Sequence, residues 1–350
     1  MKLNPRIPGT RFCRNAALAC FLAGLGAVPL VAQNQDWEKP QLTGVNNELP
    51  HATMVICPDA QTARKIGVVS NAERVKSPFY RSLNGAWKYH YSANPVARVP
   101  DFWRPPNDND RGRDGGRSQI FWRPAHQGAE LRSFNAVDQG DGVAVTVSLA
   151  LPKAAAAEWT TTYQINGLGE IAVSAQFKPG KTNLVKLPRL GMQLALAPGF
   201  ADLTWFGVGP QETYCDRKDA RVGVYSGSVA EQFCADYVKP GESGNKVDVR
   251  WVALTNAKGA GLLAAGQPLL SVNAQRHTTE DLQQALHPFQ LPPRDFVTLN
   301  LDLKQQGVGG DDSWGAWPHD ADTIPCREYN YSFRLSPFAS AKDQARLLAR

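Results

Sequence analysis

Several features on which common enzyme classes depend are missing from this sequence of 350 residues. It contains no His-Glu-x-x-His pair and no Gly-x-Ser-x-Gly elbow, which argues against a zinc peptidase and a serine hydrolase of those types. The stretch Gly307–Gly310 is not followed by Lys-Ser or Lys-Thr, so it is not a phosphate-binding loop. The histidines do not cluster along the chain; they are His51, His90, His126, His277, His287 and His319.

Cysteine is scarce, and no two cysteines have the spacing of a zinc site. The cysteines that follow residue 32 are Cys57, Cys215, Cys234 and Cys326. None lies in CxxC or CxxxH spacing, so the sequence predicts no metal site built on them. A Cys215–Cys234 disulfide and a set of four free, buried thiols are both compatible with this spacing.

The excess of basic over acidic residues is also small once the N-terminus is set aside. The first 15 residues hold no acid and four basic residues, Lys2, Arg6, Arg11 and Arg14. Without these the net charge is 6 − 4 = +2, and no Lys/Arg run indicates a nucleic-acid partner. The basic start, the apolar run over residues 16–31 and the small Ala32 predict a signal peptide over residues 1–32. We expect an exported protein, periplasmic or extracellular and free of the membrane after cleavage; a retained N-terminal anchor is the alternative.

What the sequence has in quantity is period-two alternation. Apolar residues alternate with small or polar residues over 143–149, 171–177, 247–253 and 331–335. Such stretches bury one face of a sheet. Helix signals are few, and the best is Thr278–Leu286, where Thr278 can cap and Asp281 lies three residues further on. The sequence therefore predicts an all-β fold, a large antiparallel β-sandwich over residues 102–338, followed by a tail over 339–350 that is either a short basic helix or frayed.

Segments of this strand-rich region resemble the bacterial β-galactosidases, in that family's order. Residues 102–112 (FWRPPNDNDRG) resemble the opening of the family's C-terminal small-chain domain. Residues 207–217 (GVGPQETYCDR) resemble its central signature, with Cys215 where the family usually has proline. The match continues through residues 237–244 (YVKPGESG), 248–251 (DVRW) and 307–314 (GVGGDDSW). The resemblance implies a supersandwich of the kind shared with galactose mutarotases.

Two segments near the beginning resemble the N-terminus of the same enzymes. They are residues 36–44 (DWEKPQLTG) and 77–88 (SPFYRSLNGAWK). In the family the second leads into a jelly-roll domain, but here the resemblance passes at about Pro100 to the small-chain opening. We infer an internal deletion with its join near residues 98–102. Residues 33–101 would then be a loosely held fragment of the jelly-roll domain, which a protease should trim before it cuts residues 102–338.

The resemblance implies that the family hydrolyses β-galactosides, but the matching segments of this chain do not include the family's catalytic residues. Retaining glycosidases need two carboxyl groups about 5–5.5 Å apart. The family carries both as glutamates on a barrel, and its magnesium and sodium sites also lie in domains that have no counterpart here. We therefore assign no catalytic residue, metal or cofactor to this chain. Glu212, Asp311 and Asp312 are interpreted as carboxylates that order their loops, rather than as acid catalysts or calcium ligands.

Trp314 is the one predicted substrate-binding residue. It matches the family's tryptophan that reaches from the small domain to the mouth of the active site and packs on the sugar. An indole suits that role because its flat apolar face matches sugar C–H groups and its edge carries a polar N–H. We expect Trp314 to point outward; packing in the core is the alternative, and Trp317 could share either role.

Three functions are compatible with these observations. The chain could be a β-galactosidase relic whose carbohydrate-binding domain folds but does not hydrolyse sugars alone. It could instead be a small subunit that completes a separate large chain, or that assembles as a homo-oligomer. It could also be a free-standing lectin-like or mutarotase-like module. Galactosides are the expected ligands in each case; a large-chain gene nearby would favour the second, and sugar affinity without such a gene would favour the third.

Overall fold

The computed structural model describes residues 61, 100–292, 294–312 and 315–348. The predicted signal peptide, almost all of the predicted N-terminal fragment and Trp314 lie outside these residues, so the predictions about them stay predictions. From Pro100 onward the described residues belong to one compact unit. No helix in the described ranges has the length and apolar content needed to cross a bilayer.

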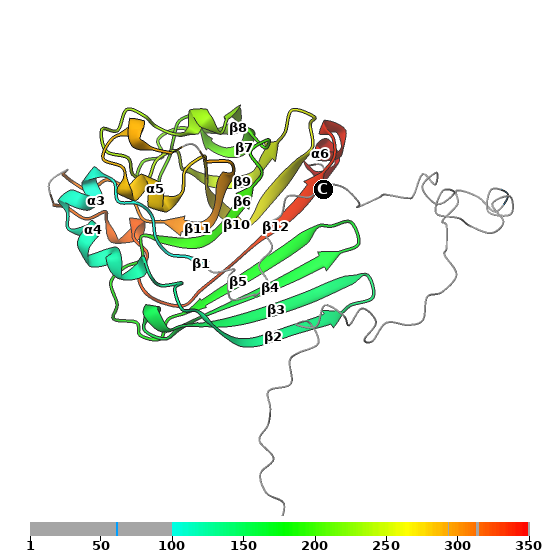
Figure 1. The fold of residues 1–350 in the computed structure, drawn as a ribbon, viewed down its shortest axis with the longest axis horizontal. Helices are drawn as coiled ribbons and strands as arrows, with labels where there is room; N and C mark the ends of the chain where they lie inside the picture. Colours follow the sequence, from blue (N-terminus) through cyan, green and yellow to red (C-terminus); the bar gives the residue numbers. More distant parts are fainter. Residues whose placement is uncertain (1–60, 62–99, 293, 313–314, 349–350) are drawn as a thin grey trace, which may run out of the picture. The chain divides into compact units, whose positions relative to one another are not determined.

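Within the described ranges twelve strands form the fold, and every pairing between them is antiparallel (Figure 1). The all-β antiparallel prediction is confirmed. The strands are β1 (Pro100–Asp101), β2 (Glu130–Asp138), β3 (Gly142–Leu151), β4 (Ala157–Asn166), β5 (Ile171–Lys178), β6 (Arg189–Leu196), β7 (Asp202–Gly209), β8 (Arg221–Ser228), β9 (Lys246–Thr255), β10 (Gly261–Gln275), β11 (Val297–Gln305) and β12 (Tyr329–Phe338).

Strand β10 joins the parts of the sheet. Its first half pairs with β12, which leads through β5, β4 and β3 to the edge strand β2. Its second half pairs with β11, which leads through β6 to β1. Strand β9 runs along the other side of β10 and carries β7 and β8. We call β2–β5 the hairpin arm; Figure 1 shows it below the strands β6, β9 and β11.

The core consists of apolar side chains from both halves of the sheet. Phe102, from the first family-like segment, lies within ring contact of Trp122, Trp159 and Phe177, at centroid distances of 5.9, 5.7 and 5.2 Å. The buried indoles keep their N–H groups satisfied: Trp159 donates to Thr161 Oγ1 at 2.8 Å. Such pairing removes the cost of burying a polar group, so this core is both apolar and hydrogen-bonded.

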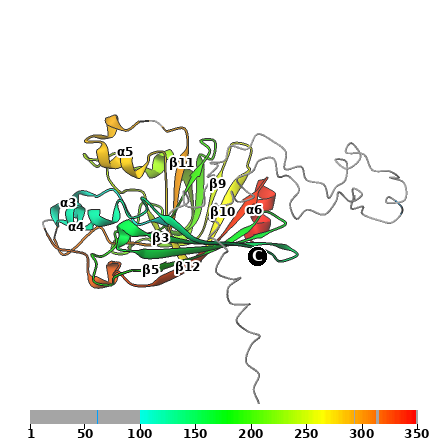
Figure 2. The ribbon, with the colours of Figure 1, turned by 60° about the horizontal axis from the view of Figure 1, so that its bottom comes forward.

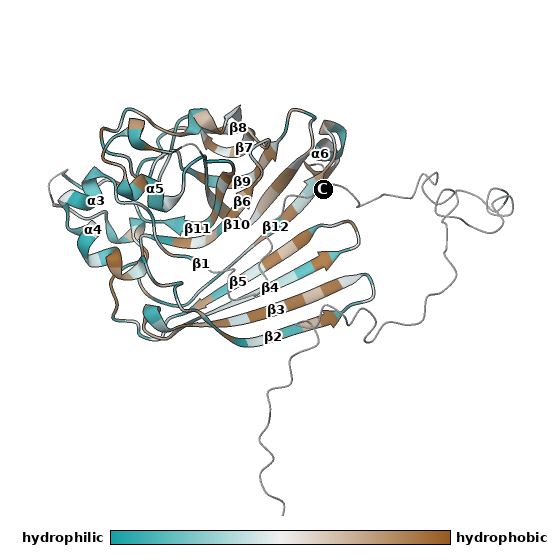
Figure 3. Ribbon diagram, viewed as in Figure 1, coloured by the Kyte–Doolittle hydropathy of each residue, from teal (hydrophilic) through white to brown (hydrophobic). Residues whose placement is uncertain are grey.

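The hairpin arm has one apolar and one hydroxyl-bearing face, as its period-two pattern predicts. Figure 3 shows the corresponding bands of different hydropathy along its strands. Threonine and serine hydroxyls pair across β3 and β4 on the second face, Thr146 with Thr162 and Ser148 with Thr160, each at 3.0 Å. The expected burial of residues 143–149 is only partly right. Val147 and Leu149 are buried, whereas Val143 is exposed because the far end of the arm extends beyond the core.

Helices are short and lie mostly at one end of the sheet (Figure 2). They are α3 (Asp108–Gly112), α4 (Gly115–Ser118), α5 (Thr279–Gln284) and α6 (Ala341–Leu348), with 3-10 turns at Gln119–Trp122, Pro152–Ala154, Ala230–Gln232, Pro288–Gln290 and Asp320–Asp322. The predicted helix after Thr278 is confirmed: the Thr278 side chain accepts from Asp281 N, and the Asp281 side chain accepts from Thr278 N. For the C-terminal tail, the helix interpretation is the right one.

Candidate functional site

The family-like segments, far apart in sequence, meet at the end of the sheet that carries α3. We call residues 102–113, 207–217, 237–245 and 305–312 together the motif end. Backbone and side-chain bonds join them directly. Glu242 N donates to Pro105 O at 3.0 Å, and Asn109 Nδ2 donates to Val308 O at 2.8 Å. The segments therefore form one structure rather than four separate loops.

The loop that leads toward Trp314 is held from two sides. On one side, the Arg104 and Arg113 guanidinium groups donate to the carbonyl oxygens of Gly307 and Gly309 at 3.0 and 2.6 Å. On the other, the Asp216 carboxylate accepts from the amides of Val308 and Gly309 at 3.0 and 2.7 Å. A Cβ at position 307 would overlap that carboxylate, which explains the glycine there.

Both arginines are buried and share one acid, Asp110. Burial disfavours the Arg104 charge, but the attraction of Asp110 together with that of Glu242 and Tyr214 outweighs it, and the pKa of Arg104 is raised. Burial lowers the pKa of Arg113, against the pull of the same carboxylate. Asp110 is placed by α3, whose N-cap Asn107 accepts from Asp110 N at 2.8 Å. The short helix thus fixes the charge on which the loop depends.

A second charged network lies beside the first, on the polar face of β6, β10 and β11. Arg189 contacts three carboxylates: Asp101 at 3.0 Å, Glu242 at 2.9 Å and Asp302 at 3.1 Å. Burial raises the pKa of Asp302 well above its usual range, although Arg189 acts in the opposite direction. Glu242 also accepts from the Asn273 amide at 2.7 Å. One buried guanidinium therefore holds β1, β6, β11 and the segment around Glu242 together.

The contacts of Glu212 fit the loop-ordering interpretation. Its carboxylate accepts from the Tyr237 hydroxyl at 2.5 Å and from Gly244 N at 2.6 Å, and it pairs with Arg217. These bonds tie the segment at 207–217 to the segment at 237–245. Each carboxylate oxygen has a structural partner, so Glu212 is committed to the fold rather than to acid–base chemistry.

The two aspartates of the glycine-rich loop also have local partners. Asp312 Oδ1 accepts from Gly315 N at 3.0 Å and from Ala316 N at 3.1 Å. Asp311 pairs with His319 at 2.8 Å, and this hydrogen bond raises the pKa of His319. Among the described residues, no three His, Cys, Asp or Glu side chains gather as metal ligands would.

Of the two tryptophans, Trp314 and Trp317, the structure describes only the second. Trp314 lies outside the described residues, so its outward direction is still a prediction. Trp317 is half-buried, and the Arg113 guanidinium lies 5.7 Å from its ring centroid. Trp317 therefore packs against the same arginine that holds the loop.

The hypothesis of a Cys215–Cys234 disulfide is wrong, because both thiols are free and so is that of Cys326. Cys215 instead lies near the carbonyl oxygens of Gln305 and Asp322, at 3.5 Å from each. Burial raises its pKa to about 12. The alternative of free thiols is right for these three, although only Cys326 is fully buried; Cys57 lies outside the described residues.

Sequence reasoning missed the residues on which this end depends most, namely Arg104, Arg113, Arg189, Asp216 and Glu242. Arg104, Asp216 and Glu242 lie in the recognised segments, but a charged residue in a motif is more often exposed, so burial was not expected. Arg189 begins a strand, and nothing local distinguishes it. Only the meeting of distant segments shows that these charges neutralise one another.

Comparison with known proteins identifies the family to which the chain belongs. The family described as "Beta galactosidase small chain" matches residues 81–335. A β-galactosidase of Priestia megaterium is 38% identical over 240 residues, which are 68% of this chain and 23% of that enzyme. A β-galactosidase of Lactobacillus delbrueckii subsp. bulgaricus is 36% identical over 227 residues, 64% of this chain and 22% of that enzyme. The chain thus spans less than a quarter of the length of these relatives.

The solved structures that match this chain are more distant. The galactosidase domain of an alpha-galactosidase-sucrose kinase is 12% identical with a TM-score of 0.37, covering 60% of this chain and 28% of that one. A galactose 1-epimerase from Lactobacillus acidophilus NCFM is 8% identical with a TM-score of 0.36, covering 59% of this chain and 66% of that one.

Proposed function

The chain belongs to the β-galactosidase small-chain family, and from this premise we propose that it supplies a sugar-contacting end for β-galactoside hydrolysis without hydrolysing the bond itself. The observation that carries the proposal is the loop at residues 307–312. Arg104, Arg113 and Asp216 hold its first three residues, 307–309, by hydrogen bonds, and the loop leads on to Trp314. A loop so well fixed suits the precise placement of a side chain against a ligand.

The carboxylates of the motif end support the second half of the proposal. Hydrolysis with retention needs one carboxyl group to donate a proton and a second to attack the sugar. Glu212, Asp216 and Glu242 each accept hydrogen bonds that hold the fold together. Using any of them for proton transfer would break a structural bond. We therefore propose that the catalytic carboxylates come from a separate β-galactosidase large chain.

The test compares the purified chain alone with the chain mixed with the large-chain portion of a relative such as the Priestia megaterium enzyme. Alone, the chain should not hydrolyse a chromogenic β-galactoside above buffer, because a positioned acid typically contributes about 10²–10⁴-fold. With the large-chain portion added, hydrolysis should rise above that of the large-chain portion by itself. Turnover by the chain alone that survives repurification would refute the proposal.

A stand-alone sugar-binding module is the second candidate, since the loop could present Trp314 to a free sugar. Calorimetric titration of the chain with galactose and lactose, without a large chain, separates the two. Millimolar or tighter binding together with failure to raise large-chain activity would favour the module. Enhanced hydrolysis with no measurable binding by the chain alone would favour the subunit.

We also propose export and an internal deletion, on the basis of the N-terminal sequence. Residues 1–32 have the layout of a signal peptide, and residues 36–44 and 77–88 resemble the N-terminus of the family's enzymes. N-terminal sequencing of the protein from the host should begin near Gln33. Reading the genomic DNA across the codons for residues 98–102 tests whether the frame is continuous there.

A further inference from the structure

Two large apolar side chains are exposed on the loop that follows α5. Phe289 is 83% exposed, more than any other large apolar side chain in the described ranges, and Leu286 is 57% exposed. Single exposed apolar side chains are ordinary on a protein surface and need no explanation. This pair is different because both side chains lie three residues apart on one short loop, within and just before the 3-10 turn Pro288–Gln290. The loop therefore presents a small apolar surface to the outside.

The loop is held in shape by its own hydrogen bonds. The Gln290 side chain accepts at Oε1 from Leu286 N at 2.7 Å and from His287 N at 3.0 Å. Gln290 N in turn donates to His287 O at 3.0 Å. The His287 and Phe289 rings stack, with centroids 5.4 Å apart and an angle of 10° between their planes. Because the loop is already ordered, little conformational entropy would be lost when a partner covers these side chains.

Helix α5, which leads into the loop, is attached to the motif end. Trp103 Nε1 donates to Gln283 Oε1 at 2.8 Å. Leu282 of the same helix lines one small cavity together with Pro105 and Glu242. Figures 1 and 2 both show α5 at the end of the sheet that carries α3 and α4. The exposed pair therefore lies at the same end of the sheet as the segments that resemble the family.

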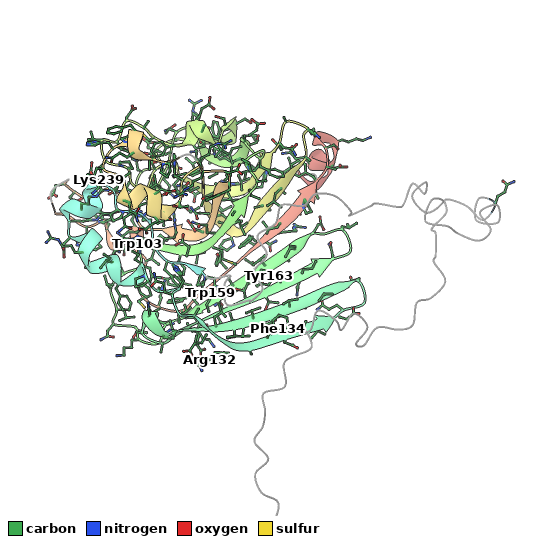
Figure 4. The ribbon with its side chains drawn as sticks, viewed as in Figure 1. Trp103, Arg132, Phe134, Trp159, Tyr163 and Lys239 are labelled. Carbon is green, nitrogen blue, oxygen red and sulfur yellow. The ribbon has the colours of Figure 1, made fainter. Side chains whose placement is uncertain are left out.

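The motif end adds a third exposed apolar side chain and paired charges beside it. Val238 is 71% exposed, and its neighbour Lys239 lies at the end that carries α5 (Figure 4). Next to the loop, Arg294 forms an ion pair with Asp281 at the start of α5. Apolar anchors with a polar rim around them are the usual composition of a protein–protein contact.

We propose that Leu286 and Phe289 are the anchors through which this chain binds a separate β-galactosidase large chain. The inference rests on the proposed function, in which such a chain supplies the catalytic carboxylates at the motif end. The large chain is the occupant that the observations favour, because the matched region is only 23% of the Priestia megaterium enzyme. The rest of that enzyme needs a surface of this region to pack against. A few central side chains contribute most of the binding energy of such contacts.

The test measures by calorimetry the Kd between the full chain and the large-chain portion of the Priestia megaterium enzyme. Phe289→Ser should raise the Kd at least about tenfold, and Leu286→Ser about three- to tenfold, because each removes an apolar anchor from the contact. Leu168→Ser is the matched control: Leu168 is 70% exposed in the turn between β4 and β5, and the substitution should leave the Kd unchanged. Thermal melts check that each variant is folded.

Hydrolysis of a neutral chromogenic galactoside separates an anchor from a sugar contact. Phe289→Ser should raise the chain concentration needed for half-maximal enhancement of large-chain hydrolysis, by the same factor as the Kd. The enhancement at saturating chain should equal that of the unchanged chain, because the anchor does not touch the sugar. Trp314→Ala should instead lower the enhancement at saturation.

The outcomes distinguish this inference from the proposed function. A Kd that Phe289→Ser leaves unchanged, with an unchanged chain that does enhance hydrolysis, overturns the anchors and leaves the proposed function standing. If the unchanged chain neither binds nor enhances, the proposed function is refuted and the anchors with it. A lower enhancement at saturation for Phe289→Ser would assign the loop to the sugar and overturn the inference. Dimers of the chain alone that Phe289→Ser dissociates, measured by sedimentation, would show that a second copy covers the loop, which also overturns it.

Discussion

The motif end and the hairpin arm are built on opposite physical principles. At the motif end, buried charges hold distant segments together, and Arg189 at 1% exposure contacts three acids. In the hairpin arm, neighbouring strands are connected by short turns, apolar side chains cover one face, and β2 is exposed along its whole length. The comparison teaches that the two regions are stabilised differently. The local alternation of apolar and polar residues forms the strands of the arm, whereas paired buried charges fix the position of the loop.

Removing the central charge of the motif end should give the largest effect. Arg189→Ala leaves Asp101, Glu242 and Asp302 without their shared partner, and stranding buried charges in this way typically costs about 3–5 kcal/mol. Urea unfolding at pH 7 should show a loss of that size. The control is Arg117→Ala: Arg117 is exposed and lies 3.8 Å from Asp114, and we expect no measurable change.

The same variant has a predictable pH dependence. The pKa of Asp302 is already raised by burial in the intact protein, and losing Arg189 should raise it further. The folded variant then binds protons that the unfolded chain releases, so its free energy of unfolding rises as the pH falls. The loss relative to the intact protein should therefore be smaller at pH 5 than at pH 8. An equal loss at both pH values would contradict the buried-charge account.

Loosening the loop itself should have an intermediate effect. Asp216→Asn keeps one oxygen acceptor but loses the charge and one of the two bonds to the amides of Val308 and Gly309. A charge-assisted hydrogen bond contributes about 1.5–3 kcal/mol, so we expect a loss of about 2 kcal/mol. Hydrogen exchange at these two amides should accelerate more than exchange in β4. Unchanged exchange would show that the arginines alone hold the loop; the control is Asp219→Asn, at an exposed neighbour.

Trp314→Ala should cost still less stability while removing function. If Trp314 points outward, the free energy of unfolding should fall by about 1 kcal/mol or less. A core tryptophan would instead cost roughly 3–5 kcal/mol. The same variant should lose any galactoside binding and any enhancement of large-chain hydrolysis. A loss above about 3 kcal/mol in a denaturant melt would place Trp314 in the core and remove the predicted sugar contact.

Much of the fold could be predicted because its signals are local. Alternation over 171–177 and 331–335 gives β5 and β12, and the Thr278–Asp281 pair gives the start of α5. The sequence pattern cannot show how far the core extends, which is why Val143 was expected to be buried and is exposed. Nor does it show that β10 bends from β12 to β11, because pairing partners are set by tertiary structure.

The site was less predictable, for a physical reason. Resemblance to a family located the segments but did not show what each charge contacts, since Asp216 lies 92 residues before the amide it accepts from. The incorrect Cys215–Cys234 pairing has the same origin. The spacing of two cysteines in the sequence does not show which way their side chains point, and the Cys215 thiol lies against the carbonyl oxygens of Gln305 and Asp322 instead. Loop-ordering roles for Glu212 and Asp312 were predictable because their glycine-containing neighbourhoods favour such bonds.

The smallest effect should come from β2, the exposed edge strand of the hairpin arm. Phe134 lies on β2, opposite Val147, and is 46% exposed (Figure 4). Phe134→Thr keeps a residue that favours strands and removes an aromatic ring that is only half-buried, so urea unfolding should show a loss of about 0.5 kcal/mol. Trp159→Ala, in β4 and 2% exposed, is the contrasting variant and should cost about 3–5 kcal/mol. If Phe134→Thr instead cost as much as Asp216→Asn, the edge strand β2 would contribute to the core, and the contrast between the arm and the motif end would be too simple. An effect of Phe134→Thr that grows with protein concentration would show that a second chain covers this face.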